Sequence, residues 1–372
     1  MKKIQMVDLK GQYQPIKEQV NQSIQEVIDT TAFINGPQVH EFQKELEEYL
    51  NVKHVIPCAN GTDALQIAMM GLGLKPGDEV ITADFTFAAT VEVIALLQLT
   101  PVLVDVDPID FNIDIEAIKK AITPKTKAIV PVHLFGKAAN MDAILEIAEE
   151  HDLFVIEDNA QAIGANYTHK DGKKVKTGAI GHVGSTSFFP SKNLGCYGDG
   201  GAIFTNDDDL AQKIKMIVNH GEKIKYHHEI IGCNSRLDSI QAEILNIKLK
   251  YLDEYNSNRK VMANIYNQAL NEIDMIKTPK VISNSDHVYH QYTLRILNGE
   301  RDKLRSYLDD LGIPSMIYYP IPIHRQKPYK NRQNLDYTDL LSKEVISLPI
   351  HSEYENSNQD YIIKMIRKFF DE

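Results

Sequence analysis

The sequence is poor in the features that mark secreted and metal-binding proteins. It has three cysteines in 372 residues: Cys58, Cys196 and Cys233. This odd count lacks the spacing of metal ligands, and it predicts reduced thiols, a cytoplasmic setting and no metal site. The first residues carry charge but no apolar core of a signal peptide, so we expect no secretion signal.

Two further absences narrow the class of protein. The longest apolar stretch, residues 86–104, contains Glu92 and is interrupted by Pro101, so we expect no membrane span. The formal net charge of −11 argues against a nucleic-acid partner, which would need a concentrated basic face. It leaves room for a local basic pocket that binds a diphosphate. A length of 372 residues is typical of a globular chain with two domains.

The part of the chain from about residue 54 to 205 alternates short β-branched runs with helical patterns. The runs that predict strands are HVIPC, DEVIT, PVLVDVD, KAIVPVHL, LFVIED, GSTSFF and GAIFT. Amphipathic stretches at 63–72, 113–122 and 140–151 predict helices between them. This rhythm predicts an α/β fold, a mainly parallel sheet with helices on both faces. Ligands of such sheets bind beyond the carboxyl ends of the strands.

The pattern changes after Arg236. Residues 237–269 predict one long helix that bridges two domains, and residues from about 271 predict a smaller α+β domain. We expect a large cofactor-binding domain over residues 1–250 and a small carboxyl-terminal domain over residues 251–372. The place of the first 35 residues is left open.

Asp158 ends the strand LFVIED in the motif EDNAQA. A carboxylate at the buried end of a strand is costly without a positive partner. The protonated nitrogen of a pyridine ring would be such a partner. The alternative, which this motif alone leaves open, is an aspartate that caps the following helix.

Lys192 lies in STSFFPSKN, a segment with almost no other charge, before the glycine-rich GCYGDGG. A lysine in an apolar setting has a lowered pKa and becomes a nucleophile toward carbonyl groups. An arbitrary lysine is more often a solvated loop residue. The neighbouring small residues favour the first interpretation, because they allow the backbone to approach a ligand closely.

Two further motifs could hold a phosphate and a flat ring. Gly61 and Thr62 in ANGTDAL follow a strand and open a helix, where backbone amides bind anions. Ser187 would add a hydroxyl group. Phe87 in TADFTFAAT would stack on an aromatic cofactor. Each motif also has an ordinary explanation: a routine turn for the first, a core aromatic for the second.

Taken together, these motifs resemble a known family. The series GTDAL, FTFAAT, VPVHLFG, EDNAQA, SFFPSKNLGCYGDGG, NHG, GCNSRLDSIQA and YYPIPIH, in this order, resembles the DegT family of sugar aminotransferases over nearly the whole chain. The resemblance implies a fold type I aminotransferase that uses pyridoxal 5′-phosphate. It also implies a homodimer with active sites shared between subunits. The substrates would be a nucleotide-linked keto sugar and glutamate, which leaves as 2-oxoglutarate, in the synthesis of a cell-surface polysaccharide such as lipopolysaccharide.

The resemblance also implies roles for individual residues. Lys192 matches the lysine that forms the Schiff base with the cofactor, and Asp158 matches the partner of the ring nitrogen. The other positions that match cofactor contacts are Gly61, Thr62, Phe87, Gln161, Ser187 and, from the other subunit, Asn234. The positions that match the substrate side are Arg236, Tyr318, Tyr319 and His324. No metal ligand is implied.

The sequence departs from the family pattern at three positions. Ala83 and Asp84 replace a Pro-Ser or Pro-Thr pair, and Val218 replaces an arginine before NHG. These departures concern substrate contacts. The VPVHLFG stretch and Gln161 favour a 3-keto over a 4-keto sugar, while the identity of the nucleotide is left open. Two alternatives remain: a sugar dehydratase, against which Lys192 argues, and a regulatory protein on the same fold, which would predict loss of site residues.

Overall fold

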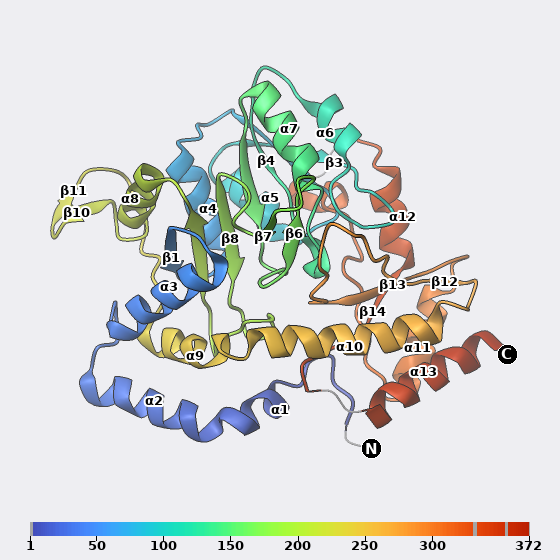
Figure 1. The fold of residues 1–372 in the computed structure, drawn as a ribbon. Coiled ribbons are helices and arrows are strands. Elements are labelled where there is room, and N and C mark those ends of the chain that lie inside the picture. The colour runs from blue at the N-terminus through green and yellow to red at the C-terminus, as the bar shows by residue number, and fades with distance from the viewer. Residues whose placement is uncertain (1–2, 330–332, 354–355, 372) are drawn as a thin grey trace.

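The structure, a computed structural model, describes residues 3–329, 333–353 and 356–371. Its centre is a seven-stranded sheet with the order β1-β9-β8-β5-β4-β2-β3 (Figure 1). The strands are β1 (His54–Cys58), β2 (Glu79–Ala83), β3 (Thr100–Val104), β4 (Thr126–Val130), β5 (Phe154–Asp158), β8 (Val183–Ser187) and β9 (Gly201–Thr205). These are the seven strands that the β-branched runs predict, and the predicted α/β class is confirmed.

The direction of the strands places six carboxyl ends at one edge of the sheet. β3, β2, β4, β5 and β8 are paired in parallel, and β9 is antiparallel to both β8 and β1. The two reversals cancel, so β1 points the same way as β8. The turns after these six strands therefore meet at one edge, where ligands of α/β sheets bind.

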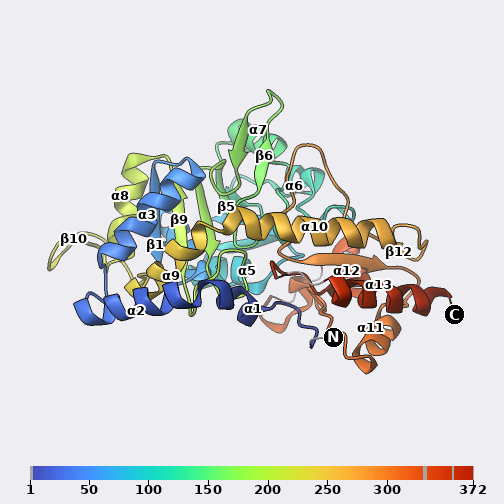
Figure 2. The same ribbon diagram turned by 60° about the horizontal axis from the view of Figure 1, so that its bottom comes forward.

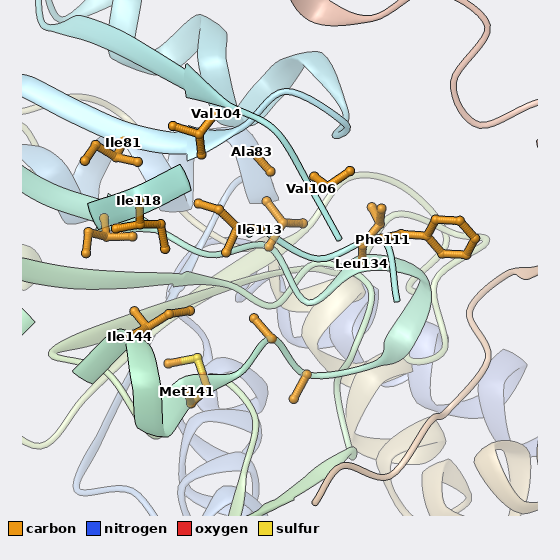
Figure 3. Close-up of a cluster of buried hydrophobic side chains, with 14 of the residues drawn as sticks. Ile81, Ala83, Val104, Val106, Phe111, Ile113, Ile118, Leu134, Met141 and Ile144 are labelled. Carbon is orange, nitrogen blue, oxygen red and sulfur yellow. The ribbon is translucent and has the colours of Figure 1, made fainter. Parts of the chain in front are cut away.

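Neighbouring residues in the strands face opposite sides of the sheet, and both sides are apolar. Ile81 and Val155 belong to a core beneath α6 (Ile115–Ala121) and α7 (Met141–His151), part of which Figure 3 shows. Their neighbours Val80 and Ile156 belong to a second core. The helices that cover this second side are α4 (Gly61–Leu72), α5 (Ala88–Leu96) and α8 (Asp208–Ile217). Burial on both faces explains why these strands read as continuous hydrophobic runs.

The predicted single helix over residues 237–269 is two helices, so that prediction is wrong in detail. α9 (Ser239–Leu249) ends at a turn formed by Lys250 and Tyr251, and α10 (Leu252–Leu270) follows. α9 packs against α2 (Lys17–Thr30) and α3 (Pro37–Leu50). The amino-terminal segment thus lies beside α9, and its first helix α1 (Leu9–Tyr13) contacts the carboxyl-terminal part through a hydrogen bond from Gln12 to Ser352.

The carboxyl-terminal part packs around a small sheet beside α10. It has the order β12 (Ile276–Lys277), β13 (Tyr292–Ile296), β14 (Val345–Leu348). The helices here are α11 (Arg301–Asp310), α12 (Asp336–Glu344) and α13 (Asn356–Asp371), and Figure 2 shows them beneath α10. The boundary at residue 250 between two domains stays a prediction.

Two short hairpins lie outside these two sheets. β6 (Asn166–Thr168) and β7 (Lys174–Lys176) form one hairpin, and β10 (Glu222–Ile224) and β11 (His227–His228) form another that projects from the body beyond α8 (Figure 1). No helix among the described residues is both long and apolar enough to cross a membrane.

Candidate active site

Asp158 is the last residue of β5, and its carboxylate is buried at the edge where the strands end. Oδ2 accepts a hydrogen bond of 2.8 Å from the hydroxyl of Thr90, and Oδ1 accepts one of 3.1 Å from the amide of Ala160. The second bond closes a turn over residues 160–164 in which no α-helix forms. Asp158 is therefore not a helix cap here, and its buried charge is left without a cationic side chain bonded to it among the described residues.

Lys192 lies in the loop that follows β8, partly buried. Burial lowers the pKa of its amine to about 8, and the nearby carboxylate of Asp158 acts in the opposite direction. Within the described residues, Nζ has no hydrogen bond and no ion pair. The solvated-loop interpretation of Lys192 therefore fails: near neutral pH an appreciable fraction of this amine is uncharged, as a nucleophile or a base requires.

The loop that carries Lys192 is fixed from below by its neighbour Asn193. The buried amide of Asn193 donates to Oδ1 of Asn256 on α10, at 2.7 Å, and to the carbonyl of Val288, at 3.1 Å. Its oxygen lies 3.2 Å from Nδ1 of His290. Burial lowers the pKa of His290 well below its ordinary value, and the charge of Lys192 adds to this. A neutral histidine is thus held beneath the lysine loop.

The start of α4 lies against the end of β8. A Cβ atom on Gly61 would meet Cβ of Ser187 at 2.6 Å, and one on Gly201 would meet the backbone of Asn60 at 2.4 Å. Only glycine allows this approach. The side chain of Asn60 accepts from the amide of Asp63, which leaves the amides of Gly61 and Thr62 without an acceptor in the helix. Free amides at a helix start, beside a serine hydroxyl, form an anion site.

An aromatic and polar wall closes another side of this site. Oε1 of Gln161 accepts from the amide of Phe135 at 2.7 Å, and its amide nitrogen donates to the hydroxyl of Tyr319 at 3.3 Å. The ring of Phe87 is 59% exposed and lies 6.4 Å from that of Tyr319. Phe87 is therefore not a core residue in this chain, and it keeps a free face for a flat ligand. Tyr318 lies beside Tyr319 and is partly buried.

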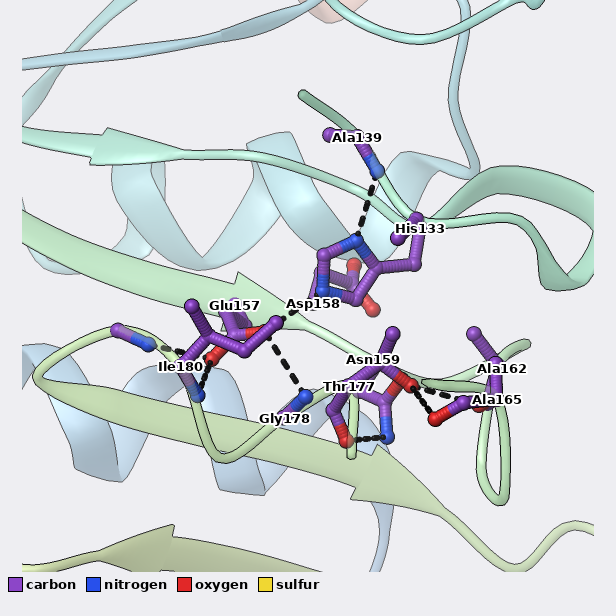
Figure 4. A network of polar contacts seen from close by, with 12 residues as sticks. His133, Ala139, Glu157, Asp158, Asn159, Ala162, Ala165, Thr177, Gly178 and Ile180 are labelled. Atoms are coloured by element: carbon purple, nitrogen blue, oxygen red, sulfur yellow. Dashed lines mark hydrogen bonds and ion pairs between the residues drawn. The ribbon is translucent and has the colours of Figure 1, made fainter. Parts of the chain in front are cut away.

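A fully buried polar network supports Asp158 from behind (Figure 4). Nε2 of His133 lies 2.7 Å from Glu157, and Nδ1 accepts from the amide of Ala139, so the ring donates to Glu157 through Nε2. Glu157 also accepts the amides of Gly178, Ile180 and Gly181. The amide of His133 donates to the carbonyl of Asp158 at 3.0 Å. Sequence reasoning missed Thr90, His133 and Glu157, although all three lie in motifs quoted above.

Two predicted residues lie on a neighbouring segment. Asn234 is exposed and pairs with Asn219 in an isolated β-bridge, and Nη1 of Arg236 is 3.5 Å from the side-chain oxygen of Asn219. Between them, the hydroxyl of Ser235 accepts from the amide of Ala59, two residues before Gly61. This segment borders the anion site, and the partners of Asn234 and Arg236 in a dimer stay a prediction.

His324 lies in the interior of the chain and does not line an open cleft. Its side chain is fully buried, and both its backbone amide and Nδ1 lie 2.7 Å from the carboxylate of Asp84. In the single chain the ring does not reach the surface of the site, so a direct contact of His324 with substrate stays a prediction. Among the described residues, no group of His, Cys, Asp and Glu side chains is arranged to hold a metal ion.

The assembled residues fit pyridoxal phosphate. The amides of Gly61 and Thr62 and the hydroxyl of Ser187 would hold its phosphate, and the free face of Phe87 would cover its ring. The buried carboxylate of Asp158 would meet the protonated ring nitrogen. The amine of Lys192, which has no hydrogen-bond or ion-pair partner among the described residues, would meet the aldehyde.

Comparison with known proteins shows the family of the chain. A model of the "DegT/DnrJ/EryC1/StrS aminotransferase family" matches residues 14–367. A UDP-2-acetamido-2-deoxy-3-oxo-D-glucuronate aminotransferase from Pseudomonas aeruginosa is 46% identical over 349 residues, which are 94% of this chain and 95% of that one. A pleiotropic regulatory protein from Geobacillus stearothermophilus is 45% identical over 374 residues, which cover 99% and 98% of the two chains.

A similar solved structure contains a bound cofactor. The NtdA structure from Bacillus subtilis with bound cofactor PMP, the amino form of pyridoxal phosphate, has a TM-score of 0.92 and 32% identity. The match covers 100% of this chain and 86% of that one. Fold and site define a fold type I aminotransferase that depends on pyridoxal phosphate. The chain belongs to the DegT/DnrJ/EryC1/StrS aminotransferase family.

Proposed function

We propose that the protein transfers the amino group of glutamate to the 3-keto group of a nucleotide-linked sugar, for the synthesis of a cell-surface polysaccharide or a related glycoconjugate. The observation that carries the proposal is that the desolvated amine of Lys192 lies near the buried carboxylate of Asp158. Gln161 and Tyr319 border the same site. The 46% identity to an aminotransferase of a 3-oxo sugar nucleotide supports the position of amination. So do the VPVHLFG stretch and Gln161.

The chemistry divides between the cofactor and the chain. When bound, pyridoxal phosphate supplies an aldehyde that takes up an amino group and a ring that accepts electrons. Asp158 would keep the ring nitrogen protonated through its charge, and Thr90 fixes the direction of that carboxylate. Lys192, with its pKa lowered to about 8, would accept a proton from the amino donor and return it during the second half of the reaction.

The substrate side would be formed by Arg236, Tyr318 and Tyr319, whereas His324 is fully buried in the single chain. Arg236 supplies a permanent positive charge, which suits a diphosphate or a carboxylate. Tyr318 and Tyr319 supply flat surfaces and hydroxyl groups for a sugar ring. These roles require the open face of the site to be covered when substrate binds, because water weakens such polar contacts.

A homodimer would provide that cover. Several large apolar side chains are exposed in the single chain: Phe87 and Phe189 in the motifs of the site, and Phe33 and Ile34 between α2 and α3. Exposed apolar groups of this size favour association with another surface. A second copy would bury them and bring Asn234 to the phosphate site of its partner.

A regulatory role is the second candidate, because the 45% identical relative carries that name. A purely regulatory protein would not need a reactive amine. Lys192 and Asp158 argue against it, since a buried charge and a desolvated lysine destabilise the fold without a compensating use.

The proposal is tested by incubating the purified protein with glutamate and a panel of 3-keto and 4-keto nucleotide sugars, with mass detection of the products. We expect amination of a 3-keto sugar and formation of 2-oxoglutarate. Amination of 4-keto sugars alone would overturn the 3-position. Absence of amination over the whole panel, with cofactor bound, would favour the regulatory candidate.

A further inference from the structure

We propose that the buried pair Asp84 and His324, called here the Asp84–His324 latch, positions the aromatic wall for the sugar substrate. The aromatic wall consists of Phe85, Phe87, Tyr318 and Tyr319. Neither residue of the latch need touch the substrate. The inference rests on the proposed function in one respect: it assumes that the substrate at the aromatic wall is a nucleotide-linked sugar. The latch itself is a property of the structure.

The latch joins two segments that are far apart in the sequence. Asp84 follows β2 directly, is fully buried, and donates its backbone amide to the carbonyl of Val104. Its two oxygens each lie 2.7 Å from a nitrogen of His324, one from the backbone amide and one from Nδ1. This bidentate contact fixes both the position and the orientation of the segment around His324, because each oxygen takes a different group of the same residue.

Both segments carry the residues that form the aromatic wall. Phe85 and Phe87 follow Asp84, and Tyr319 precedes His324 by five positions. The ring of Tyr319 lies 6.0 Å from Phe85 and 6.4 Å from Phe87, and its hydroxyl accepts from Gln161. The latch therefore ties the segment after Tyr319 to the end of β2. This segment is also held by the bridge between Met316 and Ser347 and by the ion pair of Arg325 with Asp339. Loss of the latch loosens the part between these two contacts, where Tyr319 keeps Gln161 and its ring contacts.

The charges around the latch make it sensitive to a change at Asp84. Burial raises the pKa of the Asp84 carboxyl, and the bonds from His324 oppose this. Nε2 of His324 lies 3.5 Å from Oδ1 of Asp339, which in turn pairs with Arg325. Removal of the charge at position 84 weakens both bonds to His324 at once, because a charged acceptor forms stronger hydrogen bonds than a neutral one.

The two charged groups on the cofactor side, Asp158 and Lys192, are held by other contacts. Asp158 is held by Thr90 and Ala160, and the Lys192 loop is held by Asn193. None of these bonds involves Asp84 or His324. Loss of the latch should therefore affect the reaction with the sugar and spare the reaction with the amino donor.

The chain offers a matched control at the end of the next strand. Asp105 accepts from the amides of Tyr337 and Thr338 and from the hydroxyl of Thr338, at 2.8 to 2.9 Å. It fastens the start of α12, and among the described residues it makes no hydrogen bond, ion pair or ring contact with the aromatic wall. Asp105→Asn thus removes a comparable carboxylate from the same edge of the sheet without touching the wall.

The experiment compares Asp84→Asn, Asp105→Asn and the wild type as holoenzymes. Hydrogen exchange of the peptide around residues 316–326 should become about tenfold faster in Asp84→Asn, which corresponds to the loss of one charge-assisted hydrogen bond. The sugar KM should rise about tenfold, while the single-turnover rate with glutamate, followed by cofactor absorbance, stays within about twofold. Asp105→Asn should speed exchange near residue 338 and leave the sugar KM nearly unchanged.

His324 variants separate positioning from direct contact and serve if Asp84→Asn does not fold. His324→Asn keeps an amide nitrogen close to the position of Nδ1 and should retain a sugar KM near the wild type. His324→Leu should match Asp84→Asn. Equal losses in His324→Asn and His324→Leu would overturn the latch, because they would show that the imidazole itself meets the substrate.

Two other results would also overturn the latch. One is faster exchange in Asp84→Asn with an unchanged sugar KM, and the other is an equal loss in both half-reactions. The exchange arm needs no sugar substrate. If the wild type aminates no sugar in the panel, the proposed function fails, while exchange still decides whether Asp84 holds the wall.

Discussion

The hydroxyl of Thr90 on α5 donates to Oδ2 of Asp158 on β5 at 2.8 Å, and both side chains are buried. Thr90 in turn lies 3.1 Å from the hydroxyl of Thr86. These two hydroxyl groups fix the position of one oxygen of the carboxylate at the end of β5. The position of Asp158 thus depends on the segment that also carries Phe87.

Replacement of Asp158 by Asn should slow turnover by a factor on the order of a hundred to a thousand, because the amide keeps the shape but not the charge. Affinity for the cofactor should fall much less. Thr90→Val should slow turnover by about tenfold, the loss of one hydrogen bond to a charged group. Single-turnover rates with glutamate measure both effects. Near-normal turnover of Asp158→Asn would reduce Asp158 to a turn-forming residue.

Lys192 should capture the cofactor with an unusual pH dependence. A neutral amine attacks an aldehyde, and an amine is neutral above its pKa. Since burial lowers the pKa of Lys192 to about 8, capture by the cofactor-free protein should increase as the pH rises through about 8, well below the 10.5 of an ordinary lysine. Borohydride reduction followed by peptide mapping measures it.

The reduced adduct should lie on the peptide that contains Lys192, and the yellow colour of the holoenzyme should disappear on reduction. An adduct on another lysine would reject the assignment. Lys192→Ala should still bind the cofactor and should not turn over. Lys248, a buried lysine whose pKa burial also lowers to about 8, is the internal control, because its amine already donates to the carbonyl of Gly195.

Asn193 should be important for stability as well as for the lysine loop. Asn193→Ala leaves Oδ1 of Asn256 and the carbonyl of Val288 without this donor in a buried place, which should cost about 2–3 kcal/mol in the free energy of unfolding. Asn258→Ala, which loses one partly buried bond to Ser352, should cost less than about 1 kcal/mol. Denaturant titration of the cofactor-free proteins compares the two. Equal costs would show that the Asn193 network contributes little.

Arg236 offers a test of the substrate side. A neutral replacement, Arg236→Gln, should raise the KM of the sugar nucleotide more than tenfold, because a charge-assisted contact with a diphosphate or carboxylate is lost. The KM of glutamate should change less. Equal effects on both substrates would place Arg236 in the cofactor site or in the scaffold around Asn219.

The main sheet could be predicted because its strands are buried on both faces. Runs such as KAIVPVHL and GAIFT are hydrophobic throughout and separated by amphipathic stretches, and this pattern depends only on neighbouring residues. The break at Lys250 could not be predicted in the same way. Residues 237–270 contain no glycine or proline, so no helix-breaking residue marks the turn between α9 and α10.

The same distinction holds for the site. Lys192 and Asp158 were predicted because each lies in a short motif with a chemical meaning. Asp84 and His324 are 240 positions apart, and nothing local to either residue indicates the other. Their pairing follows from the way the carboxyl-terminal part folds back onto the end of β2. Contacts of this kind depend on the tertiary structure and have no signal in a single sequence.

The shared active site of the proposed dimer can be tested with two inactive variants. Lys192→Ala removes the amine, and Asn234→Asp places a negative charge against the phosphate of the cofactor. Each variant alone should be nearly inactive. If every site takes Lys192 from one chain and Asn234 from the other, a hybrid dimer has one site with both lesions and one site with neither.

Equal mixing with free exchange of subunits makes half of the dimers hybrid, and each hybrid has one of two equivalent sites intact. Activity should therefore recover to roughly a quarter of the wild type. Exchange is checked beforehand by native mass spectrometry of differently tagged chains, and the wild type mixed with itself is the control. Recovery near zero after demonstrated exchange would mean that Asn234 serves the site of its own chain. The anchoring of its neighbour Ser235 to Ala59, beside the anion site of the same subunit, would then be the route by which it does so.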